Sequence, residues 1–256
     1  MLSEKIQWLK LYDNTPRKTE LTDKLLAKKW VKSLDLPQNC LNVAEVYTEG
    51  KTFEDLDFDK CPERFVIKTN HASGQNIIIK NKQEFLNSRG EDGVAALGFD
   101  NVRKIFNLWL SRHYAFQSGF ELQYKNIDRK VFVEEYIDDI AEYQFTCLNG
   151  VPEAIRYLKD PVTVIYSPNW TSFLSDKDKS KLIESDAYPE EVVQKPDDLD
   201  LMLEYARILS KEFKFVRVDF LKSNGKLYFA EMTFTPSSGI INDRNFDIIM
   251  GDKLKL

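Results

Sequence analysis

Four polar residues near the end of the sequence have types and spacing that suit a metal and phosphate site. They are Arg217, Asp219, Glu231 and Thr233. Arg217 and Asp219 are two positions apart, as are Glu231 and Thr233. This is the spacing of neighbours on one face of a β-strand. Carboxylate oxygens are ligands that Mg²⁺ prefers, and a guanidinium group binds phosphate and carboxylate groups in a fixed geometry. The alternative interpretation is a solvated strand face with a chance pair of acids.

A β-hairpin is the element that would position these side chains. Residues 215–221 and 226–233 alternate polar and apolar side chains, and Asn224-Gly225 lies between them. Alternation with period two predicts strands, and Asn-Gly between two such runs is a strong hairpin signal.

The length of the turn decides whether the two acids meet. A two-residue loop would pair Asp219 with Ala230, whereas a three-residue loop centred on Gly225 pairs Asp219 with Glu231 and Phe220 with Ala230. The apolar pattern favours the second register, since a one-residue slip moves every side chain to the other face. Two opposed carboxylates destabilise a sheet by roughly 0.2–1 kcal/mol. A cation must therefore offset them, and a divalent metal is the simplest candidate.

Composition limits the classes of function. The 256 residues are 43% hydrophobic and 30% charged with a net charge of −5, which argues against nucleic acid or an anionic membrane as the main partner. Cys40, Cys61 and Cys147 are far apart and no zinc spacing is present, so reduced thiols are expected. No apolar run reaches ~18 residues, which predicts a cytoplasmic chain without a membrane span.

The remaining patterns predict a mixed α+β protein. Helices are expected at 21–34, 82–88, 100–113 and 199–213, with Lys24, Lys28 and Lys32 on the more polar faces of the first. Strands are expected around 65–70, 76–80, 130–137, 143–148 and 151–158. Residues 160–195 are expected to be irregular, and the chain to end in a polar segment.

A small-residue loop lies between two of the predicted strands. Asn70–Asn76 (NHASGQN) follows Lys68 closely, and Lys80 ends the returning strand. Small residues let backbone N–H groups approach an oxyanion. The loop lacks the Gly-Lys-Ser/Thr of a Walker A motif, and a tight hairpin turn is the alternative interpretation.

Nine short blocks occur in a fixed order along nearly the whole chain. They are WLKLYD (8–13), DKLLAK (23–28), FVIKTNH (65–71), SGQNII (73–78), QYKNI (123–127), EEYI (134–137), FVRVDF (215–220), EMTFTP (231–236) and GDKL (251–254). Their order and spacing resemble the ATP-grasp proteins, and more narrowly the polysaccharide-biosynthesis branch typified by the teichuronopeptide-synthesis (TupA-like) proteins.

This resemblance implies an ATP-grasp fold, in which two α+β lobes grip a nucleotide, after a short helical N-terminal segment. Residues 1–64 would form that reduced segment. Residues 65–137 would form the small lobe with the phosphate loop and the adenine hinge, and 138–256 the large lobe with the metal-binding hairpin and the acceptor site.

The resemblance also implies nucleotide contacts. Lys24 on a helix and Lys68 on a strand would neutralise phosphate charge, and the loop at Ser73 and Gly74 would approach the phosphates. The remaining contacts would be to adenine and to the ribose hydroxyls, from Glu134, Glu135, Ile137 and Glu142.

The hairpin residues take the family's catalytic and metal roles. Asp219 and Glu231 match magnesium ligands, with Thr233 as a poorer oxygen donor where asparagine is more common, and Arg217 matches the arginine that steadies phosphoryl charge. Lys68 would share this catalytic role. Three further departures lie at Ala72, Gln75 and Gln144, where relatives more often have glycine, glycine and lysine.

The implied activity is that of an ATP- and Mg²⁺-dependent carboxylate–amine ligase that acts through an acyl phosphate, with two metal ions. Its partners would be ATP, an anionic sugar or glycan, and an amino acid or amine, with a uronic acid of a capsule-like surface polysaccharide as the expected carboxylate. Two alternatives remain: an ATP-grasp kinase that phosphorylates a sugar, and a nucleotide- or glycan-binding module without turnover. Residues 140–195, with Arg156, Tyr157, Tyr166 and Trp170, are the candidate acceptor region.

Overall fold

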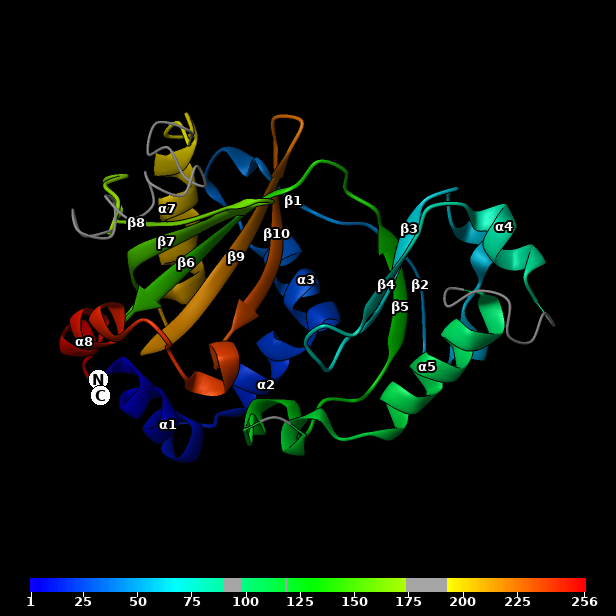
Figure 1. Ribbon diagram of the computed structural model, residues 1–256, viewed down its shortest axis with the longest axis horizontal. Coiled ribbons are helices and arrows are strands. Elements are labelled where there is room, and N and C mark those ends of the chain that lie inside the picture. Colours follow the sequence, from blue (N-terminus) through cyan, green and yellow to red (C-terminus); the bar gives the residue numbers. More distant parts are fainter. Residues whose placement is uncertain (90–97, 118, 174–192) are drawn as a thin grey trace. The chain divides into compact units, whose positions relative to one another are not determined.

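The computed structural model describes residues 1–89, 98–117, 119–173 and 193–256. Contacts divide the chain into two compact units, each with its own sheet (Figure 1). Unit 1 combines Met1–Leu9, Leu34–Asn42 and Asp139–Leu256, and unit 2 combines Lys10–Ser33 and Val43–Asp138. The N-terminal residues are therefore distributed over both units.

Unit 1 is built on a six-stranded sheet. Its strand order is β1-β10-β9-β6-β7-β8, and the pairs from β10 to β8 are antiparallel. The strands span β1 (Leu41–Val43), β6 (Ala141–Leu148), β7 (Val151–Lys159), β8 (Val162–Tyr166), β9 (Phe215–Ser223) and β10 (Lys226–Thr233). The predicted hairpins are confirmed, whereas β8 lies in a region expected to be irregular. The part of that expectation on residues 174–192 lies outside the described residues.

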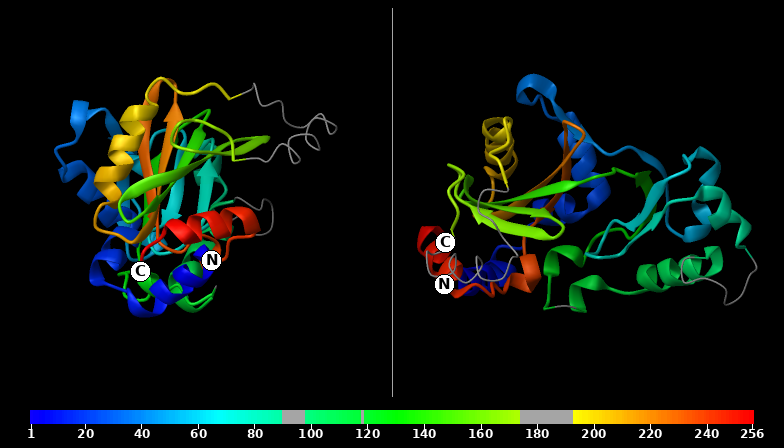
Figure 2. Two further views of the ribbon diagram at one scale, coloured as in Figure 1. Left: turned by 90° about the vertical axis from the view of Figure 1, so that its left-hand side faces the viewer. Right: turned by 45° about the horizontal axis from the view of Figure 1, so that its top comes forward.

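The two faces of this sheet differ in polarity. Phe145, Val218 and Phe220 are fully buried on one face, which α7 (Leu199–Ser210) covers (Figure 2). Arg217 and Asp219 lie on the opposite face, because successive side chains of a strand alternate. The apolar side chains thus pack the sheet against α7, and Arg217 and Asp219 belong to a polar row on the other face.

Two helices cover one end of the polar face. The backbone N–H of Ser3 in α1 (Leu2–Tyr12) donates to Asp247 in α8 (Arg244–Lys253), and Lys5 donates to the carbonyls of Gly251 and Leu254. The polar C-terminal segment that the sequence predicted contains α8, a helix that was not predicted. Asp243 caps α8 by accepting from the backbone N–H of Phe246 at 3.0 Å.

Unit 2 contains a four-stranded sheet and an aromatic core. The strand order is β2-β5-β3-β4, formed by β2 (Val46–Gly50), β3 (Phe65–Thr69), β4 (Asn76–Ile79) and β5 (Val131–Glu135). The predicted helices α4 (Lys82–Asn87) and α5 (Phe99–Ser111) are confirmed. Six phenylalanines form much of the core: Phe53, Phe58, Phe65, Phe85, Phe99 and Phe106.

The first predicted helix of unit 2 is in fact part of a helix pair. Helix α2 (Pro16–Thr22) ends before Asp23, and α3 (Lys24–Ser33) begins directly after it. The Asp23 carboxylate accepts from the backbone N–H groups of Leu25 and Leu26, which satisfies donors that every helix leaves free at its start. The expectation that Lys28 lies on a polar face is wrong, because this side chain is buried.

The hairpin register is as predicted, but the turn is not. Ser223 pairs with Lys226, so Asn224 and Gly225 form a two-residue turn, both with positive φ. A β-bulge between Phe229 and Glu231 adds the extra residue, and Phe220 consequently faces Phe229 rather than Ala230. Asp219 still faces Glu231, as expected.

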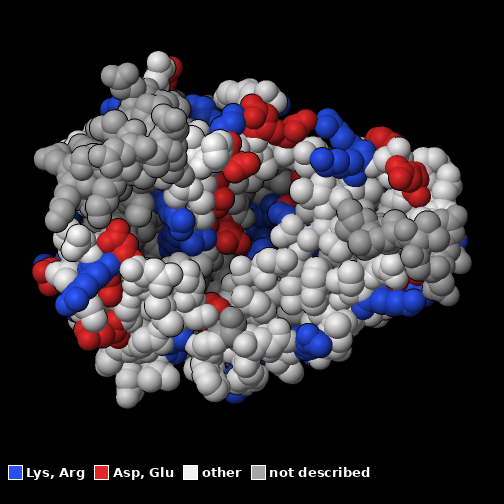
Figure 3. Space-filling view, viewed as in Figure 1, with Lys and Arg blue, Asp and Glu red and all other residues white. Residues whose placement is uncertain are grey.

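Charge is mixed on the face of the molecule drawn in Figure 3, where acidic and basic side chains are interspersed over the described part. None of the described helices has the length and apolar character needed to cross a membrane.

Candidate nucleotide and metal site

The polar row of unit 1 is a connected charge cluster. Arg217 donates from Nε to Asp219 Oδ1 at 2.8 Å and from Nη2 to Asp219 Oδ2 at 2.5 Å. The same Nη2 lies 3.2 Å from Thr233 Oγ1 and 3.6 Å from Glu231 Oε1. Thr233 in turn donates to Glu231 at 3.2 Å. The structure thus brings together all four hairpin residues that the sequence singled out.

The cluster contains two acids and one arginine, and burial differs among them. Asp219 is fully buried, and burial raises the pKa of its carboxyl to about 7 although Arg217 opposes the rise. Glu231 and Glu142 raise it further. Burial disfavours the charge of Arg217, but Asp219 and Glu231 outweigh burial and raise the pKa of the guanidinium. The cation that opposed acids were expected to need is supplied in part by Arg217.

The donors fit a magnesium ion that also has phosphate ligands. Asp219, Glu231 and Thr233 offer only oxygen atoms, which hard cations prefer. Among the described residues no group of three His, Cys, Asp or Glu side chains is placed to hold a metal by itself. In nucleotide sites Mg²⁺ is usually bound by one or two carboxylates together with phosphates and water.

In unit 2 the loop after β3 is closed by its own residues. Thr69 donates to Gln75 through both its backbone N–H and its hydroxyl, at 3.1 and 2.8 Å. Gly74 has φ +72, and a Cβ there would meet no atom within 4 Å. Ser73 and Gly74 are exposed, so their backbone is open to a ligand. Gln75 therefore helps to close the loop.

Lys24 lies at the same loop. Its Nζ donates to the carbonyl of Ala72 at 2.6 Å, which places the ammonium group beside Ser73 and Gly74. A solvated surface position for Lys24 is thus not what the structure has. The buried ring of His71 adds no charge to the loop, because burial lowers its pKa to about 4.

Lys68 shares a buried acid with a lysine that the sequence did not single out. Lys68 Nζ lies 2.5 Å from Glu134 Oε1, and Lys28 Nζ lies 2.9 Å from Oε2. Burial alone would raise the pKa of Glu134, but the two lysines outweigh it and lower the pKa. Burial lowers the pKa of Lys28. The carboxylate of Glu134 thus holds two lysines, and its side chain is only 5% exposed.

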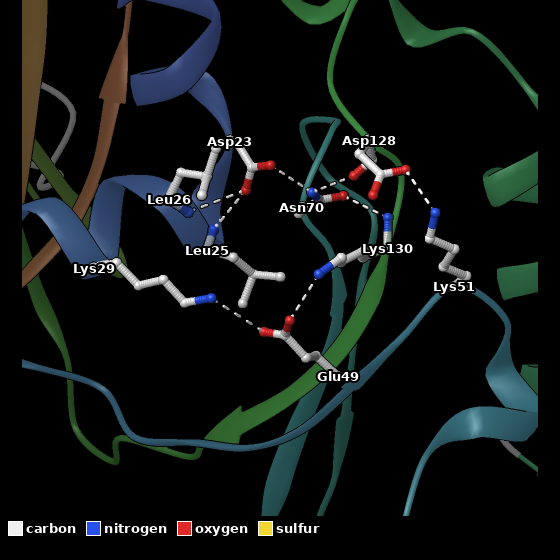
Figure 4. Close-up of polar contacts among 9 residues, drawn as sticks. All are labelled: Asp23, Leu25, Leu26, Lys29, Glu49, Lys51, Asn70, Asp128 and Lys130. Carbon is white, nitrogen blue, oxygen red and sulfur yellow. Dashed lines mark hydrogen bonds and ion pairs between the residues drawn. The ribbon is translucent and has the colours of Figure 1, made fainter.

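Asn70 connects the segments that carry these lysines (Figure 4). Its side-chain NH₂ donates to the Asp23 carboxylate at 2.7 Å and to the backbone carbonyl of Asp128 at 2.9 Å. Its side-chain oxygen Oδ1 accepts from the backbone N–H of Lys130 at 2.8 Å. The backbone N–H of Lys24 donates to the backbone carbonyl of Asn70 at 3.1 Å. Sequence reasoning missed this role, although Asp23 directly before Lys24 and Asn70 directly after β3 were available signals.

The other residues with an expected nucleotide role lie at strand ends. In unit 2, Glu135 Oε2 accepts from the backbone N–H of Glu45 at 3.3 Å, and Ile137 is half-buried just after β5. In unit 1, Glu142 Oε1 accepts from the Gln144 amide at 2.9 Å. Gln144 thus fixes the orientation of Glu142.

A left-handed turn follows β10 in unit 1. Ser237, Ser238 and Gly239 have φ of 50°, 57° and 81° in the segment Pro236–Gly239. A Cβ on Gly239 would come within 2.7 Å of Ile6 Cγ2, so glycine is required there. Non-glycine residues in this conformation cost about 1–3 kcal/mol each and often occur at functional sites.

Comparison with known proteins identifies the family. The model of the TupA-like ATP-grasp family matches residues 4–255. This chain belongs to that family. A search of the curated proteins found no match.

Several solved structures resemble this TupA-like ATP-grasp chain. One is the D-alanine–D-alanine ligase from Bacillus anthracis complexed with ATP, with 18% identity over 84% of this chain and 54% of the other, and a TM-score of 0.46. The same enzyme from Helicobacter pylori has 13% identity over 92% and 61%, with a TM-score of 0.45. The L-amino acid ligase from Bacillus licheniformis has 14% identity over 86% and 44%, with a TM-score of 0.45. The chain spans less than two thirds of the length of each.

Membership of the TupA-like ATP-grasp family confirms the ATP-grasp fold that the sequence motifs predicted. The aromatic residues suggested for an acceptor site do not lie with Arg156. Tyr157 and Tyr166 are buried, and Tyr157 packs on Tyr143, whose neighbours Phe145 and Cys147 face α7. Arg156 lies on the opposite, polar face, opposite Gln144.

Proposed function

We propose that this TupA-like ATP-grasp chain is an ATP- and Mg²⁺-dependent ligase that joins a carboxylate to an amine through an acyl phosphate. The observation that carries the proposal is the cluster of Asp219, Glu231 and Arg217, in which two opposed acids share one arginine on adjacent strands. This cluster retains an excess of negative charge for a cation, within a family whose fold binds ATP.

The lysines of unit 2 are proposed to hold the phosphates. Lys24 at the loop and Lys68 on β3 supply positive charge, and Ser73 and Gly74 supply exposed backbone N–H groups. Glu134 acts by fixing Lys68, rather than by an open contact with adenine. The adenine and ribose contacts are proposed for the chain around Glu135 and Ile137 and for Glu142.

Asp219 and Glu231 are proposed to hold magnesium, with Thr233 as a further oxygen donor. When bound, the metal ions would screen charge on the phosphates and favour phosphoryl transfer. Arg217 donates hydrogen bonds to the transferring group from its place beside both acids.

The proposed reaction has two steps. A substrate carboxylate oxygen attacks the γ-phosphorus, the bond to the ADP oxygen breaks, and an acyl phosphate forms. The amine nitrogen then attacks the acyl carbon, inorganic phosphate leaves, and the nitrogen loses a proton to give an amide. Arg217 and the backbone around Ser237, Ser238 and Gly239 are proposed to stabilise the oxyanion of the second step.

The finer proposal concerns the substrates and the cellular role. We propose a uronic acid of a surface polysaccharide, or of its precursor, as the carboxylate, and an amino acid or small amine as the nucleophile. The reaction would take place in the cytoplasm. Membership of the TupA-like family supports this choice.

The test is release of ADP stimulated by a uronic acid and an amine. Asp219→Asn and Glu231→Gln are each expected to reduce the rate at least a hundredfold, while circular dichroism reports an intact fold. Asp200→Asn, on exposed α7 surface, is the matched control and should retain the wild-type rate. Retained turnover in either hairpin variant would remove the proposed metal site. Phosphosugar in place of phosphate plus amide would indicate a kinase, and ATP binding without turnover a binding module.

A further inference from the structure

A cavity of about 400 Å³ lies over the polar face of the unit 1 sheet. Strands β6 to β9 contribute Gln144, Thr146, Arg156 and Arg217 to its lining, and the turn after β10 contributes Ser237. The cavity thus adjoins the residues proposed for catalysis but extends beyond them toward β8.

Arg156 is a basic residue of this cavity that the proposed chemistry does not use. It is exposed, and its side chain forms no hydrogen bond or ion pair with any described residue. Strand register puts Arg156 opposite Gln144, and Gln144 opposite Asp219. Arg156 therefore lies on the same face as Asp219, two strands away, with the backbones separated by about 10 Å at the usual strand spacing.

The cavity also has an apolar part. Phe173 and Phe246 meet edge to face with their ring centroids 6.0 Å apart, and Ile241 also lines the cavity. Ile165 lies on the sheet itself, paired with Arg156. The hydroxyl of Thr146 and the amide of Gln144 lie on the sheet side. Apolar rings, hydroxyl and amide groups and a guanidinium group together suit a sugar ring that bears an acid.

The charge of the surroundings favours a single negative charge on the ligand. Asp243 also lines the cavity. Asp219 and Glu231 lie on β9 and β10, paired with each other, near Arg217 of the lining. A dianion such as a phosphate ester would meet more repulsion from these acids than a carboxylate, which carries one charge. Guanidinium binds carboxylate through paired hydrogen bonds.

We propose that this cavity binds a hexuronic acid, with Arg156 as the residue that binds its carboxylate and the rings of Phe173 and Phe246 as the surface for the C–H face of the ring. The assignment rests on the ligase function proposed above and names the residue that selects its carboxylate substrate. Arg156 and Arg217 line the same cavity, so the acid that Arg156 selects is retained in the cavity that adjoins the proposed catalytic residues.

The test is a titration of the full chain with ligand in the absence of ATP, in which binding is measured by ligand-observed NMR. D-Glucuronate is expected to bind, and Arg156→Gln is expected to weaken its binding at least tenfold, because a charge-assisted pair is lost. Arg207→Gln removes an exposed arginine of α7 on the other face and should bind as the wild type does. Glucose tests the need for the acid, and acetate tests the need for the ring; each is expected to bind at least tenfold more weakly than glucuronate.

Equal binding of glucuronate by the wild type and Arg156→Gln would overturn the assignment. Equal binding of acetate and glucuronate would also overturn it, since the cavity would then hold any small anion. The ligase proposal stands or fails separately by ADP release. Arg156-dependent binding without turnover would support this site and refute the ligase, and turnover of glucuronate unchanged in Arg156→Gln would do the reverse.

Discussion

The two units carry charge clusters of opposite composition. In unit 2, Lys28 and Lys68 share one buried acid, Glu134. In unit 1, Asp219 and Glu231 share one arginine. The first cluster has a lysine in excess and the second an acid in excess. The charges within each cluster are therefore only partly neutralised. The remaining charge has the sign that suits the proposed ligand, which is phosphate in unit 2 and a metal ion in unit 1.

The largest effect is expected from removal of the shared acid of unit 2. Glu134→Gln leaves two lysines near each other, one of them buried, and is expected to reduce the free energy of unfolding by about 3 kcal/mol. Urea unfolding measures the change, and Glu45→Gln, at an exposed position, should shift it by less than about 0.5 kcal/mol. The double variant Glu134→Gln with Lys28→Met is expected to recover part of the loss. A stable single variant would show that the lysines do not depend on Glu134.

Removal of the shared arginine of unit 1 should have a smaller and pH-dependent effect. Arg217→Gln leaves Asp219 buried beside Glu231, and the pKa of Asp219, already about 7, rises further. A folded-state pKa above the unfolded value favours the native state below it, so stability falls as pH rises through that pKa. We expect a loss of about 2 kcal/mol at pH 8 and less at pH 6, since protonation limits the cost.

The same variant tests the metal assignment. At pH 8, Mg²⁺ should raise the stability of Arg217→Gln more than that of the wild type, because the ion can replace the lost positive charge. Urea unfolding at both pH values, with and without Mg²⁺, measures these effects. A loss that is equal at pH 6 and pH 8 and insensitive to Mg²⁺ would contradict the proposed excess of negative charge.

The smallest effects are expected from two glycines, one in each unit. Gly225 in the hairpin turn and Gly74 in the loop both have positive φ, and a Cβ on either meets no atom within 4 Å. Replacement by alanine is expected to cost about 1 kcal/mol in each case, from backbone strain alone. Only Gly74→Ala should also weaken ATP binding, measured by calorimetry, since only that backbone is proposed to contact phosphate. Equal ATP affinity in both variants would remove the loop from the site.

How far the sequence predicts this site is clear from the hairpin. Alternation of polar and apolar residues was enough to place Asp219 opposite Glu231, because the buried face permits one register. The predicted three-residue turn is wrong. Asn224-Gly225 forms the two-residue turn that these residue types favour, and a bulge at Ala230 restores the register. A bulge depends on packing across the sheet, which no local pattern records.

Other features depended on contacts between distant segments. Lys28 lies one turn after Lys24, yet its burial follows from Glu134, more than a hundred residues away. The cavity near Arg156 depends on the strand order and on the position of α8. The sequence signal for α8 is its capping residue, Asp243.

Trapping of the acyl phosphate tests the proposed ligase chemistry most directly. Glucuronate, ATP, Mg²⁺ and the full chain would be incubated with hydroxylamine, which captures an acyl phosphate as a hydroxamate, and the products would be resolved by mass spectrometry. The predicted result is a glucuronohydroxamate formed in a one-to-one ratio with ADP, and absent with Asp219→Asn. ADP accompanied by a phosphorylated sugar and no hydroxamate would contradict it.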